Sequence, residues 1–157
     1  MDPLAALADW PVAAALRRST VLYPLVNAAH ILGIGLLVGS IFTLDARVLG
    51  AFGRVPLGVL GPPLVRVAGI GLAAAVATGF LLFSVRPAEY AGNTAFLVKL
   101  GFLALGLLNV LVLHRGAGWR GALAGGRIAW PVRAAAAVSL LVWTGAVLAG
   151  RWIGFSG

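Results

Sequence analysis

Long stretches of the chain contain no aspartate, glutamate, lysine or arginine, and they alternate with short polar segments. The four longest of these uncharged stretches cover residues 19–44, 67–85, 100–114 and 134–150. A bilayer core about 30 Å thick is crossed by about 20 apolar residues in an α-helix. We therefore predict four membrane-spanning helices, at residues 20–45, 63–85, 93–115 and 131–153.

Proline and glycine residues predict where these helices are interrupted. Residues 51–63, which contain three prolines, predict a turn-rich connection that cannot continue as one helix. Residues 116–128 contain five glycines and predict a second loop, and the Arg86–Pro87 junction predicts a shorter break. Residues 3–18 are rich in alanine and leucine but too short to span a bilayer, and they predict an amphipathic segment on the membrane surface.

The expected fold is a single all-α integral membrane domain that covers residues 1–157. It is an antiparallel four-transmembrane-helix bundle with a short N-terminal interfacial segment. Small residues let membrane helices approach closely, and we expect the bundle to pack through Gly35, Gly39, Gly101, Gly106 and Gly145. Glycine faces that the bundle does not use could contact further helices, so a homo-oligomer is expected as well.

The composition agrees with a membrane protein and excludes several other classes. Of the 157 residues, 61% are hydrophobic and a further 22 are glycine, whereas only four are acidic. The absence of cysteine excludes disulfides, thiolate metal sites and thiol nucleophiles. Although the formal net charge is +8, the basic residues lie between apolar stretches, which favours lipid headgroups over nucleic acid as their partners.

The distribution of arginine predicts an orientation in the membrane. Seven arginines flank the first and third connections, and four lie at the opposite ends of the helices. Because basic residues concentrate in cytoplasmic loops, the seven-arginine side is predicted to be cytoplasmic and both termini outside. Eleven arginines against one lysine also point to a bacterial source, which makes the bacterial cytoplasmic (inner) membrane the expected location.

Polar side chains inside the predicted spans are the candidates for chemistry, because each is costly in a bilayer. Tyr23, Asn27 and His30 are spaced by four and three residues, so they share one helix face, which continues through Gly33. His30 lies roughly 15 Å from the end of its helix. A neutral imidazole there can ligate haem iron or copper, or it can simply hydrogen-bond between helices, for example to Asn109. Gly33 leaves room for either a flat ring or another helix.

Lys99 is predicted to lie about 9 Å inside the third span. Its long side chain can extend back to the headgroups, or it can reach towards His30 as a counter-charge or proton carrier. Asn109 borders the same face and could line the same cavity. His114 lies at the far end of this helix, some 20 Å from the depth of His30, so the two histidines are not expected to share one iron.

The other polar residues have simpler interpretations from sequence. Asp45 and Arg47 are expected to form a salt bridge or to be solvated at the membrane surface. Thr78, Ser84, Ser139 and Thr144 can bond to their own helix backbone and say little about function. Soluble-enzyme motifs such as a phosphate loop or a nucleophile elbow are absent, and the sequence does not decide whether the protein is an enzyme.

Two stretches resemble a bacterial superfamily of small membrane proteins that includes the CopD copper-resistance domain and the HemJ-type protoporphyrinogen oxidases. They are residues 27–39, NAAHILGIGLLVG, and residues 90–115, YAGNTAFLVKLGFLALGLLNVLVLHR. The resemblance implies haem or porphyrin handling by His30 and Lys99. The closest likeness is to uncharacterised four-helix members, for which no activity is implied.

The leading hypothesis is a membrane protein that binds haem b, with His30 as the axial ligand and metal-binding residue. Its expected role is electron transfer or porphyrin handling, with a membrane redox partner. The other residues expected to line the cofactor site are Tyr23, Asn27, Gly33, Lys99 and Asn109. Two alternatives remain open: a transport module for copper or a small solute, and a non-catalytic accessory subunit of a membrane complex.

Overall fold

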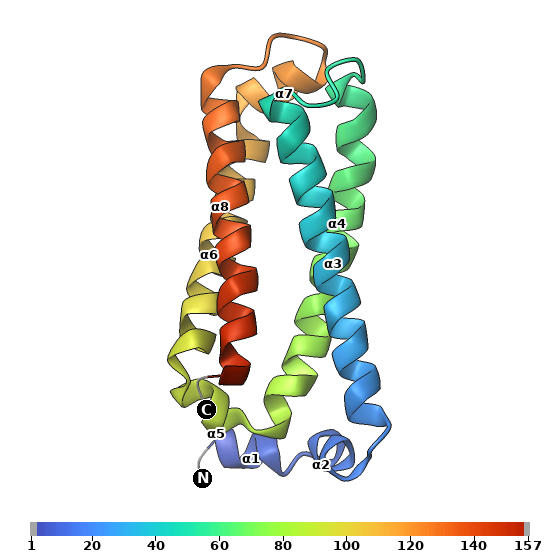
Figure 1. The fold of residues 1–157 in the computed structure, drawn as a ribbon, viewed down its shortest axis with the longest axis vertical. Coiled ribbons are helices and arrows are strands. Elements are labelled where there is room, and N and C mark those ends of the chain that lie inside the picture. Colours follow the sequence, from blue (N-terminus) through green and yellow to red (C-terminus); the bar gives the residue numbers. More distant parts are fainter. Residues whose placement is uncertain (1–2, 156–157) are drawn as a thin grey trace.

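The computed structural model describes residues 3–155, and almost all of them are helical (Figure 1). Four helices are long and apolar enough to cross a membrane: α3 (Leu22–Leu49), α4 (Leu57–Val85), α6 (Thr94–Arg115) and α8 (Trp130–Trp152). The short elements are α1 (Pro3–Ala8), α2 (Pro11–Arg18), α5 (Pro87–Gly92), α7 (Ala117–Leu123) and the 3₁₀ turn η1 (Ile153–Phe155). The prediction of an all-α protein with four long apolar helices is confirmed.

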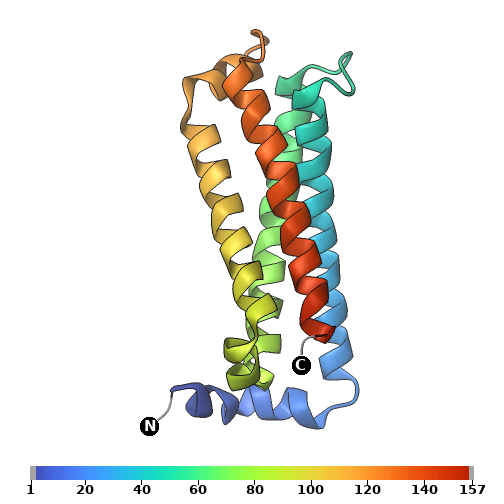
Figure 2. The same ribbon diagram turned by 60° about the vertical axis from the view of Figure 1, so that its left-hand side comes forward.

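The two ends of the molecule carry different short elements. α1, α2, α5 and η1 lie at one end, which we call the terminal end because both ends of the described chain are there (Figures 1 and 2). α7 and the connection between α3 and α4 lie at the other end, which we call the α7 end. α1 and α2 run across the long helices, and Ala13 and Leu16 of α2 are buried. This agrees with an N-terminal segment that does not span.

The prolines between the first two long helices do not act as expected. The predicted connection over residues 51–63 is too long, because α4 already begins at Leu57 and contains Pro62 and Pro63. These prolines lie in the second turn, so the backbone carbonyls they leave unbonded are close to the helix end, where water and headgroups can reach them. Leu57 and Gly61 are buried, and the packing of this first part of α4 holds it helical.

The loop predicted over residues 116–128 also contains more structure than expected. Helix α7 occupies residues 117–123, and its Trp119 and Ala122 are buried in a hydrophobic cluster with α3, α4 and α8. The five glycines of this region therefore do not prevent a helix. Two apolar side chains at helical spacing anchor it to the bundle.

The long helices pack as two close pairs, α3 with α4 and α6 with α8, and the pairs meet mainly where α3 contacts α8. In the first pair, a Cβ added at Gly71 would lie 2.5 Å from the Leu37 nitrogen and 2.7 Å from the Gly33 oxygen. In the second pair, Gly106 lies against the buried Trp143, and Gly145 lies against Phe102. Only glycine permits these approaches.

The expectation of packing through five glycines is correct for two of them. Gly106 and Gly145 do contact the neighbouring helix, whereas Gly35, Gly39 and Gly101 have no atom within 4 Å of an added Cβ. The close glycine contact of α3 is made instead by Gly33, two residues before Gly35 and on a different face of the helix. The spacing of glycines along α3 does not indicate which face of the helix packs against a neighbouring helix.

The buried hydrophobic clusters lie at the α7 end and in the middle of the molecule. One cluster includes Val48, Trp119 and Ala136, and the other consists of Leu37, Ile41 and Trp143. Neither includes a residue from the terminal half of α3. The polar residues of that half therefore lie outside the tightly packed core.

Candidate functional site

His30 projects from the terminal half of α3 onto α4, and it is half-buried. Its Nδ1 lies 3.0 Å from the hydroxyl oxygen of Thr78. Because the Thr78 hydroxyl donates to the Ala74 carbonyl at 2.6 Å, it can only accept from the imidazole. Nδ1 therefore carries the proton, and the lone pair is on Nε2.

The Nε2 atom of His30 has no hydrogen-bond partner among the described residues. It is also not a buried, unpartnered polar atom of the kind found at Asp45 Oδ2. The ring is placed by Gly79, where an added Cβ would lie 3.0 Å from the Cε1 atom. A neutral imidazole with Nδ1–H bonded and Nε2 free is the usual form of a metal-ligating histidine. The environment on α4 thus prepares His30 as a ligand.

Gly33 does not belong with this group. A Cβ at Gly33 would lie 2.9 Å from the backbone nitrogen of Ala75, so α4 occupies the space that its missing side chain leaves. The sequence allowed either a flat ring or another helix to pack against Gly33, and in the structure a helix, α4, packs there. We therefore assign Gly33 to helix packing.

Tyr23 and Asn27 share the face of α3 that carries His30, as their spacing predicts. Asn27 is exposed and makes no hydrogen bond within the described part of the chain. Tyr23 is half-buried, and its hydroxyl interacts with that of Tyr90 from α5. Burial, together with Tyr23, raises the pKa of Tyr90, which keeps this phenol neutral.

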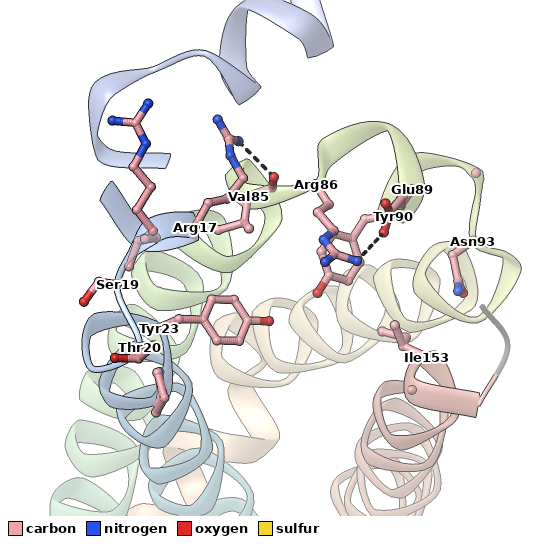
Figure 3. A pocket seen from close by; sticks show the side chains of 15 residues that line it. Arg17, Ser19, Thr20, Tyr23, Val85, Arg86, Glu89, Tyr90, Asn93 and Ile153 are labelled. Atoms are coloured by element: carbon pink, nitrogen blue, oxygen red, sulfur yellow. Dashed lines mark hydrogen bonds and ion pairs between the residues drawn. The ribbon is translucent and has the colours of Figure 1, made fainter. Parts of the chain in front are cut away.

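Tyr23 and Tyr90 border a cavity of about 1070 Å³ at the terminal end (Figure 3). The residues around it come from the end of α2, the start of α3, α5 and η1. Arg17, Arg18, Arg86 and Glu89 supply its charged groups. By helix rise, His30 lies about 10 Å further into the membrane-spanning part than Tyr23.

Lys99 comes from the neighbouring pair of helices and lies alongside α8. A Cβ added at Gly150 would lie 3.5 Å from its Cδ atom and 3.9 Å from its Nζ atom. The side chain is half-buried, forms no ion pair among residues 3–155, and is close enough to His30 for an electrostatic interaction. It is therefore a basic side chain without an acidic partner among the described residues.

Asn109 and His114 do not join this group. The Asn109 side chain donates to the Ala135 carbonyl of α8 at 3.0 Å, which fixes it between α6 and α8. His114 lies at the α7 end, where its Nδ1 is 2.9 Å from the Val110 oxygen and its ring meets Trp119 edge-on. The expectation that Asn109 lines a cavity with His30 is therefore not supported by its contacts. His30 lies in the terminal half of α3, whereas His114 lies at the α7 end.

Asp45 differs most from its expected environment. Its side chain does not pair with Arg47, whose Nε instead donates to the Val55 carbonyl. Asp45 is 5% exposed, interacts with the buried Ser139 of α8, and leaves Oδ2 without a partner. The sequence placed this carboxyl at the surface because it assumed that the helix ends at residue 45, whereas α3 continues to Leu49.

Two contacts that define the site were not identified from sequence. Thr78 was interpreted as bonding only to its own helix backbone, which it does, but the same hydroxyl also accepts from His30. Nothing in the sequence distinguishes Gly79, which lies against the His30 ring, from the other glycines. Both residues are on α4, and their relation to His30 depends on how α3 and α4 pair, which no spacing along one helix reveals.

Together, the fold and the site define an all-α protein with four helices long and apolar enough to cross a membrane, in which His30 bonds to Thr78 and the basic groups lie apart from it. Within the described residues no three histidine, cysteine or acidic side chains form a metal-binding group. The chain belongs to a family described as "Family of unknown function (DUF6644)", whose model matches residues 18–156. No curated protein and no solved structure matches it.

Proposed function

We propose that this protein is an antiparallel four-helix domain of the bacterial cytoplasmic membrane that binds haem b through Nε2 of His30. The role proposed for it is electron transfer or porphyrin handling. The observation that carries the proposal is the hydrogen bond from Nδ1 of His30 to Thr78, because it leaves Nε2 as a ligand with a fixed tautomer.

The residues around His30 suit the chemistry of this group. The Thr78 hydroxyl accepts from Nδ1–H of the imidazole, which increases the electron density that the ring can donate to a metal. Lys99 supplies a positive charge that no acidic side chain pairs with among residues 3–155, which suits the negatively charged propionates of a haem. When bound, haem would supply a one-electron couple at its iron, and these residues would hold and orient it.

The histidines of the described chain provide one axial ligand and not two. His114 lies at the α7 end, and its Nε2 is enclosed by the protein, so it is not available to the group that His30 would hold. The second axial position is therefore left to a non-histidine group or to an exogenous ligand.

The ligand set favours haem over a dedicated copper site. Soft copper(I) ligands are missing from the sequence, which has no cysteine and a single methionine at its first position. One histidine with one free nitrogen supplies too few ligands to hold a copper ion on its own. It is, however, sufficient for a macrocycle that already supplies four nitrogens to its iron.

The visible spectrum of the purified protein, prepared from membranes with haem supplied, tests the proposal. We expect a Soret band in the unaltered protein and its loss in His30→Ala. His114→Ala is the matched control, since it removes an imidazole from the opposite end of the molecule, and it should retain the band. A colourless protein, or a band that persists in His30→Ala, would overturn the proposal.

A further inference from the structure

The cavity at the terminal end lies at the depth where lipid headgroups would be. Its arginines lie just outside two candidate spans, with Arg17 and Arg18 before the start of α3 and Arg86 directly after the end of α4, and the ends of the spans complete the lining. Its volume of about 1070 Å³ is ample for the polar part of a small amphiphile.

The cavity has positive charge that the described residues lining it do not neutralise. Three arginines and one glutamate line it, which gives a formal charge of +2. Arg17 is held in place by two backbone carbonyls, Val85 at 3.1 Å and Ala8 at 2.5 Å, and carbonyls leave its full charge in place. Within the described chain the one ion pair is Arg86–Glu89, at 3.4 Å and well exposed, so it screens little.

The remaining lining residues combine neutral donors with an apolar wall. Tyr23 and Tyr90 direct their hydroxyls towards each other across the cavity (Figure 3). Because the pKa of Tyr90 is raised, its hydroxyl remains an O–H donor at neutral pH. Leu16 and Ile153 supply apolar surface beside these polar groups. Fixed cations, neutral hydroxyl donors and apolar surface together match an anionic headgroup attached to an apolar body.

We propose that this cavity is a binding site for the phosphate of an anionic membrane lipid, with Arg17 and Arg86 as its cationic groups and Tyr90 as a hydroxyl donor. The site is separate from Nε2 of His30 and does not depend on haem. A free phosphate ion shares the recognised chemistry, so the test includes it as a second source.

Calorimetric titration of the purified full-length protein in neutral detergent measures this binding. The titrants are short-chain phosphatidylglycerol, short-chain phosphatidylcholine and sodium phosphate, each added separately. We expect saturable binding of phosphatidylglycerol, with affinity for phosphatidylcholine at least about tenfold lower. Phosphate that binds as tightly as phosphatidylglycerol would support the anion site and identify the free ion as its ligand. Equal affinity for the two lipids would overturn the proposal.

Arg86→Gln is the variant of choice, because the Arg86 side chain is exposed and its exposed ion pair contributes little to folding. Loss of one charge-assisted hydrogen bond should weaken phosphatidylglycerol binding about tenfold or more. Arg66→Gln, an exposed position in the first half of α4 towards the α7 end, makes the same charge change away from the cavity and should leave affinity unchanged. Equal weakening in both variants would show a general surface effect and overturn the site.

Discussion

At the scale of single residues, the Thr78 hydroxyl is the feature that separates His30 from an ordinary buried histidine. Thr78→Val keeps the shape of the side chain but removes the acceptor for Nδ1–H. Loss of such a partner typically lowers metal affinity by about 10- to 100-fold. We expect a decrease of that size in a haem titration followed by absorbance. Thr144→Val is the control, because Thr144 also bonds its own helix, at the Leu140 carbonyl, but lies on α8 and is exposed.

Lys99 is expected to act on a bound haem through its charge. Lys99→Gln removes a positive charge that interacts with His30, and a positive charge favours the reduced iron, so the midpoint potential should fall by on the order of tens of millivolts. Redox titration of the haem band measures this. Lys99→Arg retains the charge and should remain close to the original potential. An unchanged potential in Lys99→Gln would mean that the side chain only reaches towards the headgroups.

Asp45 gives a prediction about stability. A buried carboxylate oxygen without a partner is costly, and Asp45 has no cationic partner among the described residues. Asp45→Asn keeps the size and the possibility of bonding Ser139 but removes the ionisable group. We expect its thermal midpoint in detergent to be equal to or higher than that of the unaltered protein. A clear decrease would indicate that the carboxyl has a partner that the amide cannot replace.

The sequence was sufficient to single out His30, Tyr23 and Lys99 as candidates, because an ionisable or polar side chain inside an apolar stretch is conspicuous. It was not sufficient for Thr78 or for the burial of Asp45. Thr78 is important only because α4 lies against α3, and Asp45 is buried only because α3 extends four residues further than its apolar stretch suggests. Both depend on contacts between helices.

At the scale of helices, substitution of Gly71 and of Gly35 by alanine is predicted to change the stability of the protein very differently. Gly71→Ala would place a methyl group 2.5 Å from the Leu37 nitrogen, and backbone cannot move aside cheaply, so we expect a loss of about 1–3 kcal/mol. Gly35→Ala meets open space and should be neutral, or stabilising by up to about 1 kcal/mol. Unfolding in detergent, followed by circular dichroism, compares them. Equal effects would contradict the observed pairing of α3 with α4.

The boundaries of the helices show why local sequence rules were only partly successful. Proline predicts a helix end, yet α4 contains Pro62 and Pro63 because they lie close enough to its start for the lost hydrogen bonds to be replaced. Glycine-rich sequence predicts a loop, yet α7 forms because Trp119 and Ala122 are buried against the bundle. In both segments, burial of apolar side chains outweighs the local preference of the backbone.

At the scale of the whole molecule, the class of the fold follows directly from the apolar stretches, whereas the pairing of the helices does not. All four long helices carry small residues, so several pairings are compatible with the sequence. The structure selects α3 with α4 and α6 with α8. The first and third connections, which carry or adjoin seven arginines, lie at the α7 end, whereas α2 and α5 lie at the terminal end (Figure 1).

This separation of charge leads to a prediction about orientation. Seven arginines belong to the segments that meet at the α7 end and four to those at the terminal end, so the α7 end should face the cytoplasm. Because the chain contains no cysteine, single-cysteine variants report cleanly. In intact cells, a membrane-impermeant thiol reagent should label Ala88→Cys, on α5, and should not label Ala124→Cys, after α7, until the membrane is opened.

Both positions are exposed, so a difference in labelling reflects the side of the membrane rather than burial in the protein. If Ala124→Cys alone were labelled in intact cells, the α7 end would face outside. The predicted orientation would then be wrong, although the number of spans would still be even. Labelling of both variants in intact cells would show that the two ends lie on the same side. That result would contradict a bilayer crossing by the long helices, since α6 separates residue 88 from residue 124 by one span.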